Sequence, residues 1–288
     1  MGFSIKEIIY EKKYLIYLAN QENSGPWFSF KLKSKDFGTL PVILKNIEPT
    51  PIYRLVNSRI GTHINRITLD FDINEYFKKL VRENKLKTTS FRKKKSLIRL
   101  YIDIYIYPKT PYIMSYFTLK NFSDYELIDF SIYFVFDFDI NGLEGYDNDY
   151  SGYDSENDLL FQYDKTGLHA GFSTIAKPTH YEACLTNDFR IDNEKMNLSN
   201  TLYEGPGEIL SALQNKFKTL EPGQSFQTLL ILSGGYSVEE LIQNIKEGKA
   251  RALKFLSQVN KSIKSNQRNL QEIAFNKINL QEAKDCNE

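Results

Sequence analysis

The chain of 288 residues is poor in the residues that build metal and disulfide sites. It has two cysteines, Cys184 and Cys286, and three histidines, His63, His169 and His180. The cysteines show neither metal-ligand spacing nor a disulfide framework, so a reducing compartment is expected. With the histidines also scattered, the sequence does not predict a zinc site.

The sequence also lacks long apolar runs and an excess of charge of one sign. No run approaches the ~18 apolar residues that a membrane-spanning helix needs. Charged residues interrupt residues 1–20, which therefore do not resemble a secretory signal peptide. The formal net charge of +1 argues against a nucleic-acid partner that contacts the whole surface. We expect a cytoplasmic globular protein without membrane or nucleic-acid partners.

What the chain has in quantity is the alternating pattern of β-strands, from near the N-terminus to residue 232. In residues 97–107, one face would carry Tyr101, Asp103, Tyr105 and Tyr107, and the other Leu100, Ile102, Ile104 and Ile106. Such a strand is expected to turn one face to a core and the other to a wet surface. Further runs at 112–121 and 127–139 follow turn-forming residues. The pattern predicts an all-β fold, a large two-sheet sandwich over residues 1–236.

The pattern changes at residue 237. Ser237 is suited to cap the start of a helix, and Glu239 and Glu240 would lie in its first turn. Apolar residues then recur at helical spacing, at Val238, Leu241, Ile242 and Ile245. We therefore predict a helical tail or linker over residues 237–288, whose apolar stripe packs on the sandwich or docks on a partner.

Two segments resemble a known family. They are LIRLYIDIYIYPKTPYIMSYFTLKNFSDYELIDFSIYFVFDFDINGLEGYDNDYSGYDSENDLLFQYD and LEPGQSFQTLLILSGGYSVEELIQNI. Both resemble the N-terminal super-β-sandwich of bacterial and archaeal family-15 glycoside hydrolases, the glucoamylases and glucodextranases. In that family an Asn at a hairpin turn, here Asn121, leads to an acidic loop. A strand ending in Gly then precedes a Ser-x-Glu-Glu helix, here Gly234 to Glu240. The resemblance implies a galactose mutarotase-like sandwich with a C-terminal helical segment.

The resemblance does not extend to a catalytic domain. Family-15 catalysis uses two carboxylates of an (α/α)6 barrel as general acid and general base, and the chain shows no such barrel. The resemblance thus implies a non-catalytic carbohydrate-related module, either a scaffold or a sugar-binding partner of a separately encoded catalytic subunit. Two alternatives stay open: an aldose mutarotase or epimerase, and a protein-interaction module without a sugar ligand.

The stretch from Asn121 to Asp164 contains twelve Asp or Glu and no Lys or Arg. Within it, Asp137, Asp139, Asn141 and Gly142 reproduce the first half of a calcium-loop spacing, D-x-D-x-N-G. The twelfth position is not a bidentate Glu and a strand precedes the loop, so the pattern is not an EF-hand. A solvated acidic loop, a Ca²⁺ site and an acidic surface for a basic partner all stay open. Ca²⁺ is the one cofactor that the sequence suggests.

Aromatic and acidic residues mix in the second half of this stretch. Sugars present apolar C–H faces that stack on aromatic rings and hydroxyl groups that bind carboxylates. The candidates for sugar contact are Tyr146, Asp147, Asp149, Tyr150 and Tyr153. The alternative is an exposed loop whose composition reflects an AT-rich genome.

A mutarotase needs a general acid and a general base, commonly a His with a carboxylate. The residues that could provide them are His169, His180, Glu182 and Glu208. Their spacing does not demand this role, because a single His on a strand is more often a hydrogen-bonded structural residue.

A basic run spans residues 82–99, with eight Lys or Arg against the single Glu83. It is typical of a loop tip that its charges keep in water. The run could also pair with the acidic stretch, within one chain or across a homo-oligomer.

Overall fold

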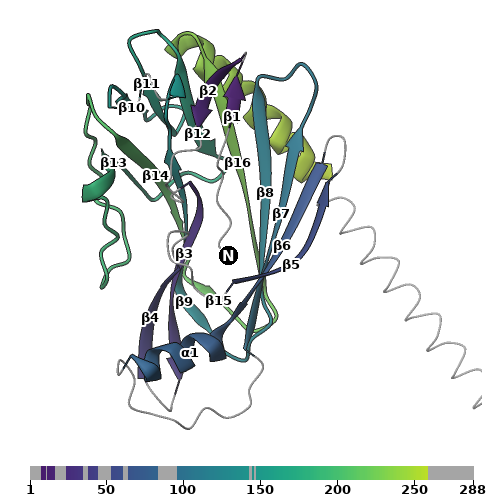
Figure 1. The fold of residues 1–288 in the computed structure, drawn as a ribbon. Coiled ribbons are helices and arrows are strands. Elements are labelled where there is room, and N and C mark those ends of the chain that lie inside the picture. The colour runs from purple at the N-terminus through teal and green to yellow at the C-terminus, as the bar shows by residue number, and fades with distance from the viewer. Residues whose placement is uncertain are drawn as a thin grey trace, which may run out of the picture. The chain divides into compact units, whose positions relative to one another are not determined.

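The computed structural model describes residues 8–10, 12–16, 24–34, 38–44, 53–60, 64–83, 96–142, 145 and 147–258 (Figure 1). Two antiparallel sheets of eight and six strands form a sandwich, and β1 and β2 make a separate two-stranded hairpin. The order in the larger sheet is β10-β11-β12-β16-β8-β7-β6-β5. The smaller sheet has the order β13-β14-β9-β3-β4, with β15 paired to β9. The predicted all-β, two-sheet fold is confirmed.

The strands are generally longer in the middle of each sheet than at its edges. The larger sheet contains β5 (Tyr53–Ile60), β6 (Ile64–Asp72), β7 (Leu97–Ile106), β8 (Tyr112–Asn121), β10 (Tyr150–Asp154), β11 (Leu159–Tyr163), β12 (His169–Thr174) and β16 (Ser225–Gly235). The smaller sheet contains β3 (Gly25–Ser34), β4 (Gly38–Leu44), β9 (Leu127–Asp137), β13 (His180–Leu185), β14 (Ile209–Lys216) and β15 (Thr219–Leu220). The remaining elements are β1 (Ile8–Tyr10), β2 (Lys13–Ile16), helix α1 (Ile73–Arg82) and the 3-10 turn η2 (Thr186–Asp188).

Phenylalanine rings join the two sheets across the core. Phe117 of β8 lies 5.0 Å from Phe134 of β9, measured between ring centroids. Phe136 of β9 lies 4.6 Å from Phe172 of β12. All four side chains are buried, and tilted ring pairs of this kind add to the burial of apolar area that holds the sheets together.

Strand β7 follows its predicted alternation only in part, because Ile106 on the predicted core face is 46% exposed. Leu100 and Ile102 are buried in the core, as expected. The other face is not uniformly wet, because Asp103 and Tyr105 are buried as well. Asp103 keeps its charge paired through two hydrogen bonds from the guanidinium of Arg66, at 2.5 and 2.6 Å.

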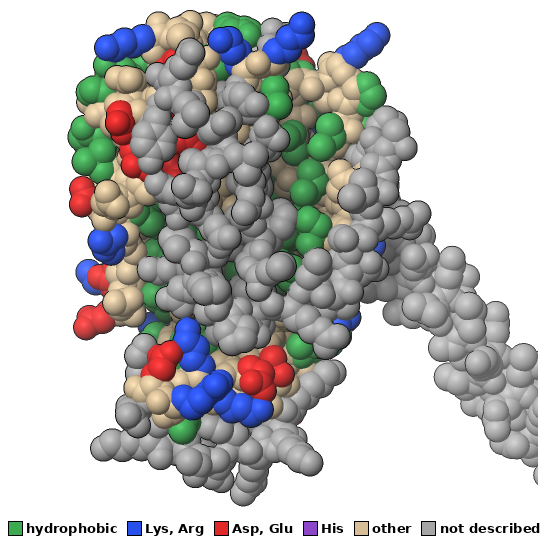
Figure 2. Space-filling model, viewed as in Figure 1, with side chains coloured by type: hydrophobic (Ala, Val, Ile, Leu, Met, Phe, Trp, Pro, Cys, Tyr) green, Lys and Arg blue, Asp and Glu red, His purple; other side chains and the backbone are tan. Residues whose placement is uncertain are grey.

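Helix α1 interrupts the succession of strands, which the sequence pattern did not predict. Asp72 caps its first turn by accepting a hydrogen bond from Asn74 N at 2.9 Å. Ile73, Phe77 and Leu80 then bury one face of the helix in the core. The helix lies at one end of the sandwich, where Figure 2 shows basic and acidic side chains together on its outer surface.

Asn121 ends β8 and is fully buried, at the turn that leads to β9 in the other sheet, so the expected hairpin at this position is wrong. Its amide nitrogen donates to the carbonyl oxygens of Tyr125 at 2.7 Å and Leu220 at 3.0 Å. Its amide oxygen accepts from the main-chain N–H and the hydroxyl of Ser123. One side chain therefore holds the turn and attaches β15 to it.

A helix spans residues 238–258 of the described chain, as predicted. Ser237 caps it, since its hydroxyl oxygen accepts from Glu240 N at 3.2 Å, and Glu240 Oε2 accepts in turn from Tyr236 N. The chain divides into two compact units, Met1–Gly248 and Lys249–Glu288. The predicted boundary at residue 237 stays a prediction. In the described ranges, no helix is both long and apolar enough to cross a membrane.

Candidate functional site

The two acidic residues at the end of β9 are buried. Asp137 and Asp139 are 5% and 4% exposed. Asn141 takes a left-handed backbone conformation, and its side-chain oxygen accepts a hydrogen bond from Lys13 Nζ at 2.9 Å. Among the residues that the structure describes, no three His, Cys, Asp or Glu side chains gather closely enough to hold a metal ion. A calcium site at Asp137, Asp139 and Asn141 therefore stays a prediction. The described residues do not add a cluster of three such ligands to support it.

Asp149 is the most deeply buried carboxyl group of this region. It is 1% exposed, and its Oδ1 has no hydrogen-bond partner among the described residues. Burial raises the pKa of Asp149 to about 9, against a hydrogen bond from the Ile140 main chain that lowers it. The neighbouring charges of Asp139, Asp164 and Asp137 raise it further. Asp149 is thus a neutral acid at pH 7, suited to donate a hydrogen bond.

The other sugar candidates lie in different surroundings. Asp147 is exposed, and Tyr146 lies outside the described residues. Tyr153 of β10 stacks on Tyr181 of β13, with ring centroids 4.1 Å apart. Because β10 and β13 belong to different sheets, this stack connects the two sheets at one side of the sandwich.

Tyr150 belongs to a row of three aromatic rings on neighbouring strands, which we call the aromatic ladder. Tyr150 of β10 stacks on Tyr163 of β11 at 5.4 Å, and Tyr163 stacks on His169 of β12 at 5.2 Å. The pairing of the strands places these three residues directly opposite one another. All three side chains are half-buried, at the side of the larger sheet where β10, β11 and β12 lie together (Figure 1).

Some polar groups of the ladder form no hydrogen bond with the described residues. No described residue forms a hydrogen bond with the hydroxyl of Tyr150 or Tyr163. His169 Nδ1 lies 2.8 Å from the carbonyl oxygen of Gly167. Since a carbonyl only accepts, His169 Nδ1 donates this hydrogen bond, and Nε2 forms none with a described residue. The exposed carboxylate of Glu239 is nearby. Hydrogen bonds from its own main-chain N–H and from Ser237, and then the charge of His169, lower its pKa.

The four predicted catalytic residues are distributed over both sheets. His169 lies on β12 of the larger sheet, whereas His180 and Glu182 lie on β13 of the smaller one. Burial and the charge of Lys216 lower the pKa of His180. Glu182 is buried, and its Oε2 accepts from Ser199 N at 2.9 Å. The fourth residue, Glu208, precedes β14.

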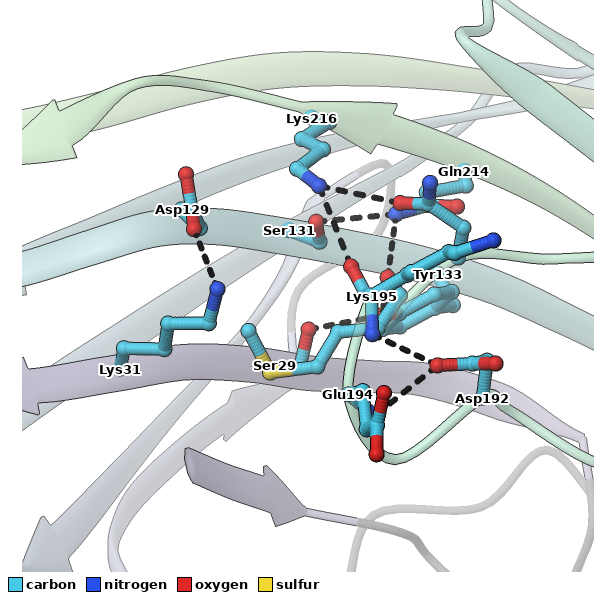
Figure 3. A network of polar contacts seen from close by, with 12 residues as sticks. Ser29, Lys31, Asp129, Ser131, Tyr133, Asp192, Glu194, Lys195, Gln214 and Lys216 are labelled. Carbon is cyan, nitrogen blue, oxygen red and sulfur yellow. Dashed lines mark hydrogen bonds and ion pairs between the residues drawn. The ribbon is translucent and has the colours of Figure 1, made fainter. Parts of the chain in front are cut away.

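A polar network on the smaller sheet joins β3, β9 and β14 to the segment around Met196 (Figure 3). Gln214, which pairs with His180, donates to Ser131 Oγ at 3.0 Å and to the Met196 carbonyl at 2.8 Å. The Tyr133 hydroxyl donates to the same carbonyl at 2.6 Å. These bonds attach the segment around Met196 to β9 and β14. The polar groups of this network bond to one another, which is typical of a structural support.

No sequence pattern predicted the cleft beside the β1–β2 hairpin, which has a volume of about 710 Å³. It is lined by Ile8, Ile9, Leu15, Ile106, Lys109, Thr110, Pro111, Tyr112, Ile113, Leu232, Ser233, Gly234, Glu240 and Asn244. The lining residues come from the hairpin, the turn between β7 and β8, the end of β16 and the C-terminal helix. Their separation along the chain explains why no local pattern pointed to the cleft.

Comparison with known proteins gives similarity at the level of fold only. No family model matches the chain, and no curated protein matches its sequence. A bacterial glucoamylase solved in complex with acarbose is similar over 79% of this chain and 30% of its own, at 12% identity and a TM-score of 0.47. A polysaccharide lyase is similar over 81% and 30%, at 11% identity and a TM-score of 0.40.

A galactose mutarotase-like protein from Clostridium acetobutylicum is similar over 73% of this chain and 79% of its own, at 10% identity and a TM-score of 0.39. The chain thus spans about a third of the glucoamylase and the lyase. A glucoamylase and a mutarotase-like protein are thus both among the structures to which the chain is similar.

Proposed function

We propose that the chain is a non-catalytic carbohydrate-binding module that binds an oligosaccharide at the aromatic ladder. The observation that carries the proposal is the row Tyr150–Tyr163–His169, three stacked and half-buried rings whose tyrosine hydroxyls and imidazole Nε2 form no hydrogen bond with a described residue. Half-exposed rings offer apolar surface to sugar C–H groups. Their polar atoms, with the carboxylate of Glu239, offer both donors and acceptors to sugar hydroxyls.

The non-catalytic character is supported by the placement of the candidate acids and bases. General acid–base catalysis needs both groups within hydrogen-bond reach of one substrate. His169 lies on one sheet, and His180 and Glu182 lie on the other. As the sequence resemblance implies, we further propose that the module serves a separately encoded catalytic subunit.

The test is calorimetric titration of the chain with a panel of oligosaccharides, gluco-oligosaccharides among them. Tyr163 is the middle ring, so Tyr163→Ala removes both stacking contacts of the ladder. A ring contact contributes about 1–1.5 kcal/mol, so we expect affinity to fall about tenfold. Tyr163→Phe keeps the ring and should retain most of the affinity. Tyr107→Ala is the matched control, because Tyr107 also stacks on a neighbouring ring, that of Tyr105.

Two results would overturn the proposal. One is that no oligosaccharide of the panel binds, which would favour the protein-interaction alternative. The other is that Tyr163→Ala binds as well as the unmodified chain does. Exchange of aldose anomers, followed by NMR, separately tests the mutarotase alternative. Catalysed exchange that is lost in His180→Ala would support that enzyme instead.

A further inference from the structure

The cleft beside the β1–β2 hairpin has apolar walls with solvent-exposed isoleucines. Ile9 is 54% exposed and Ile106 is 46% exposed, and both line the cleft. Leu15, Ile113 and Leu232 continue the apolar lining. Because Leu15 and Leu232 are already buried, a bound aliphatic group would cover mainly Ile9 and Ile106. Removing such surface from water is favourable in proportion to its area. The volume of about 710 Å³ lies within the range of small-molecule sites.

Most polar groups of the cleft are already bonded within the protein. The hydroxyl groups of Thr110 and Ser233 donate to the carbonyl oxygens of Tyr107 and Pro111. Asn244 Nδ2 donates to the Gly234 carbonyl at 2.9 Å. Glu240, the one carboxylate of the lining, accepts from the main-chain N–H of Tyr236 at the start of the helix. These groups shape the cleft and are engaged without a ligand.

Lys109 is the exception. It is exposed at the turn between β7 and β8, and its ammonium group forms no hydrogen bond or ion pair with any described residue. It is also the only cation among the described residues that line the cleft. A left-handed backbone at Lys109, with φ of 63°, sets the direction in which its side chain leaves the turn. An unpaired cation at the border of an apolar cleft complements a ligand with one anionic end.

We propose that this cleft binds a small amphipathic anion, an aliphatic chain that ends in a carboxylate. The chain lies against Ile9 and Ile106, and the carboxylate pairs with Lys109. This site is separate from the aromatic ladder, and its occupation does not depend on the proposed sugar binding.

Titration with sodium decanoate, below its micelle concentration, tests the proposal by calorimetry and by thermal shift. We expect decanoate to bind, acetate to be inactive and 1-decanol to bind at least fivefold more weakly than decanoate. Lys109→Gln should weaken decanoate binding at least fivefold and leave 1-decanol binding unchanged. Ile106→Ser, at a position exposed enough to tolerate it, should weaken both about tenfold. Lys177→Gln removes an exposed lysine away from the cleft and is the matched control.

The proposal is overturned if decanoate does not bind at millimolar concentration. It is also overturned if Lys109→Gln and Ile106→Ser both bind decanoate as tightly as the unmodified chain does. Equal binding of decanoate and 1-decanol would overturn the assignment of the anionic end. Melting temperatures of the variants without ligand show whether each still folds. Oligosaccharide affinity measured on Lys109→Gln should match that of the unmodified chain, which keeps this test distinct from the test of the ladder.

Discussion

Replacing Asp149 with asparagine removes a buried ionisable group while preserving the shape of the side chain. In the folded protein the pKa of Asp149 is raised to about 9, first by burial and then by the charges of Asp139, Asp164 and Asp137. In the unfolded chain the carboxyl group returns to its ordinary value of 3.8. Between these two values the folded state holds a proton that the unfolded state has lost. Stability therefore decreases as the pH rises through this range.

The size of the effect follows from the width of that range. Each pH unit between the two pKa values costs about 1.4 kcal/mol of folding stability. Raising the pH from 5 to 8 crosses three units, so Asp149 alone should lower the free energy of unfolding by up to about 4 kcal/mol. Asparagine cannot ionise, and its oxygen can still accept the hydrogen bond from the Ile140 main chain. The Asp149→Asn variant should lose this part of the pH dependence.

Urea unfolding at pH 5, 6.5 and 8 measures the difference directly. At pH 5 the variant should already be the more stable by about 1.6 kcal/mol, because the unfolded carboxyl group has ionised while the folded one stays protonated. By pH 8 this difference in stability should have grown by up to about 4 kcal/mol. Asp147→Asn is the control, since Asp147 is an exposed neighbour. If the stability of Asp149→Asn falls with pH as steeply as that of the unmodified chain, the account of a buried neutral acid is wrong.

Two further predictions follow from buried polar groups. Asn121→Ala removes four hydrogen bonds and leaves buried main-chain groups unsatisfied, so it should lower the free energy of unfolding by about 2–4 kcal/mol. Urea unfolding tests this, with exposed Asn148→Ala as a control that should change little. Burial, followed by the charge of a neighbouring glutamate, raises the pKa of Cys184 to about 12. In a Cys286→Ser background, a thiol reagent at pH 8 should modify Cys184 only after denaturation, and rapid modification of the native protein would contradict this.

The sheet architecture was predictable because it depends on local alternation. The strand that begins at Leu97 shows its core face as a run of aliphatic residues at every second position, and the structure buries Leu100 and Ile102 accordingly. Helix α1 was missed although its signals are present in the sequence. Asp72 is a favourable cap, and Ile73, Phe77 and Leu80 follow at helical spacing. The helix is only ten residues long and lies between two strand patterns, so its signals do not stand out from theirs.

The burial of residues in the acidic stretch could not be deduced from local alternation. Twelve acidic residues without a Lys or Arg indicate a solvated surface, yet several of them are buried. Their burial depends on partners far along the chain. Asp149 pairs with Gly207, whose N–H donates to its carbonyl at 3.0 Å. Asn141 is bonded to Lys13 across 128 residues. No local pattern encodes contacts of this range, so the burial and the pKa of Asp149 emerge only from the folded chain.

The acidic stretch nevertheless contributes to the aromatic ladder through its turns. Asp154 ends β10, and its Oδ1 accepts from the main-chain N–H groups of Glu156 and Asn157. Asp164 follows β11 and accepts in the same way from Thr166. Such Asp-centred turns fix where each strand reverses, and hence the register of the hairpin. Because side chains alternate between the faces of a sheet, a slip of one residue would turn a ladder ring toward the core. The carboxylates that set these two turns thereby place Tyr150, Tyr163 and His169 side by side. The acidic stretch is thus required for the geometry of the proposed sugar-binding surface.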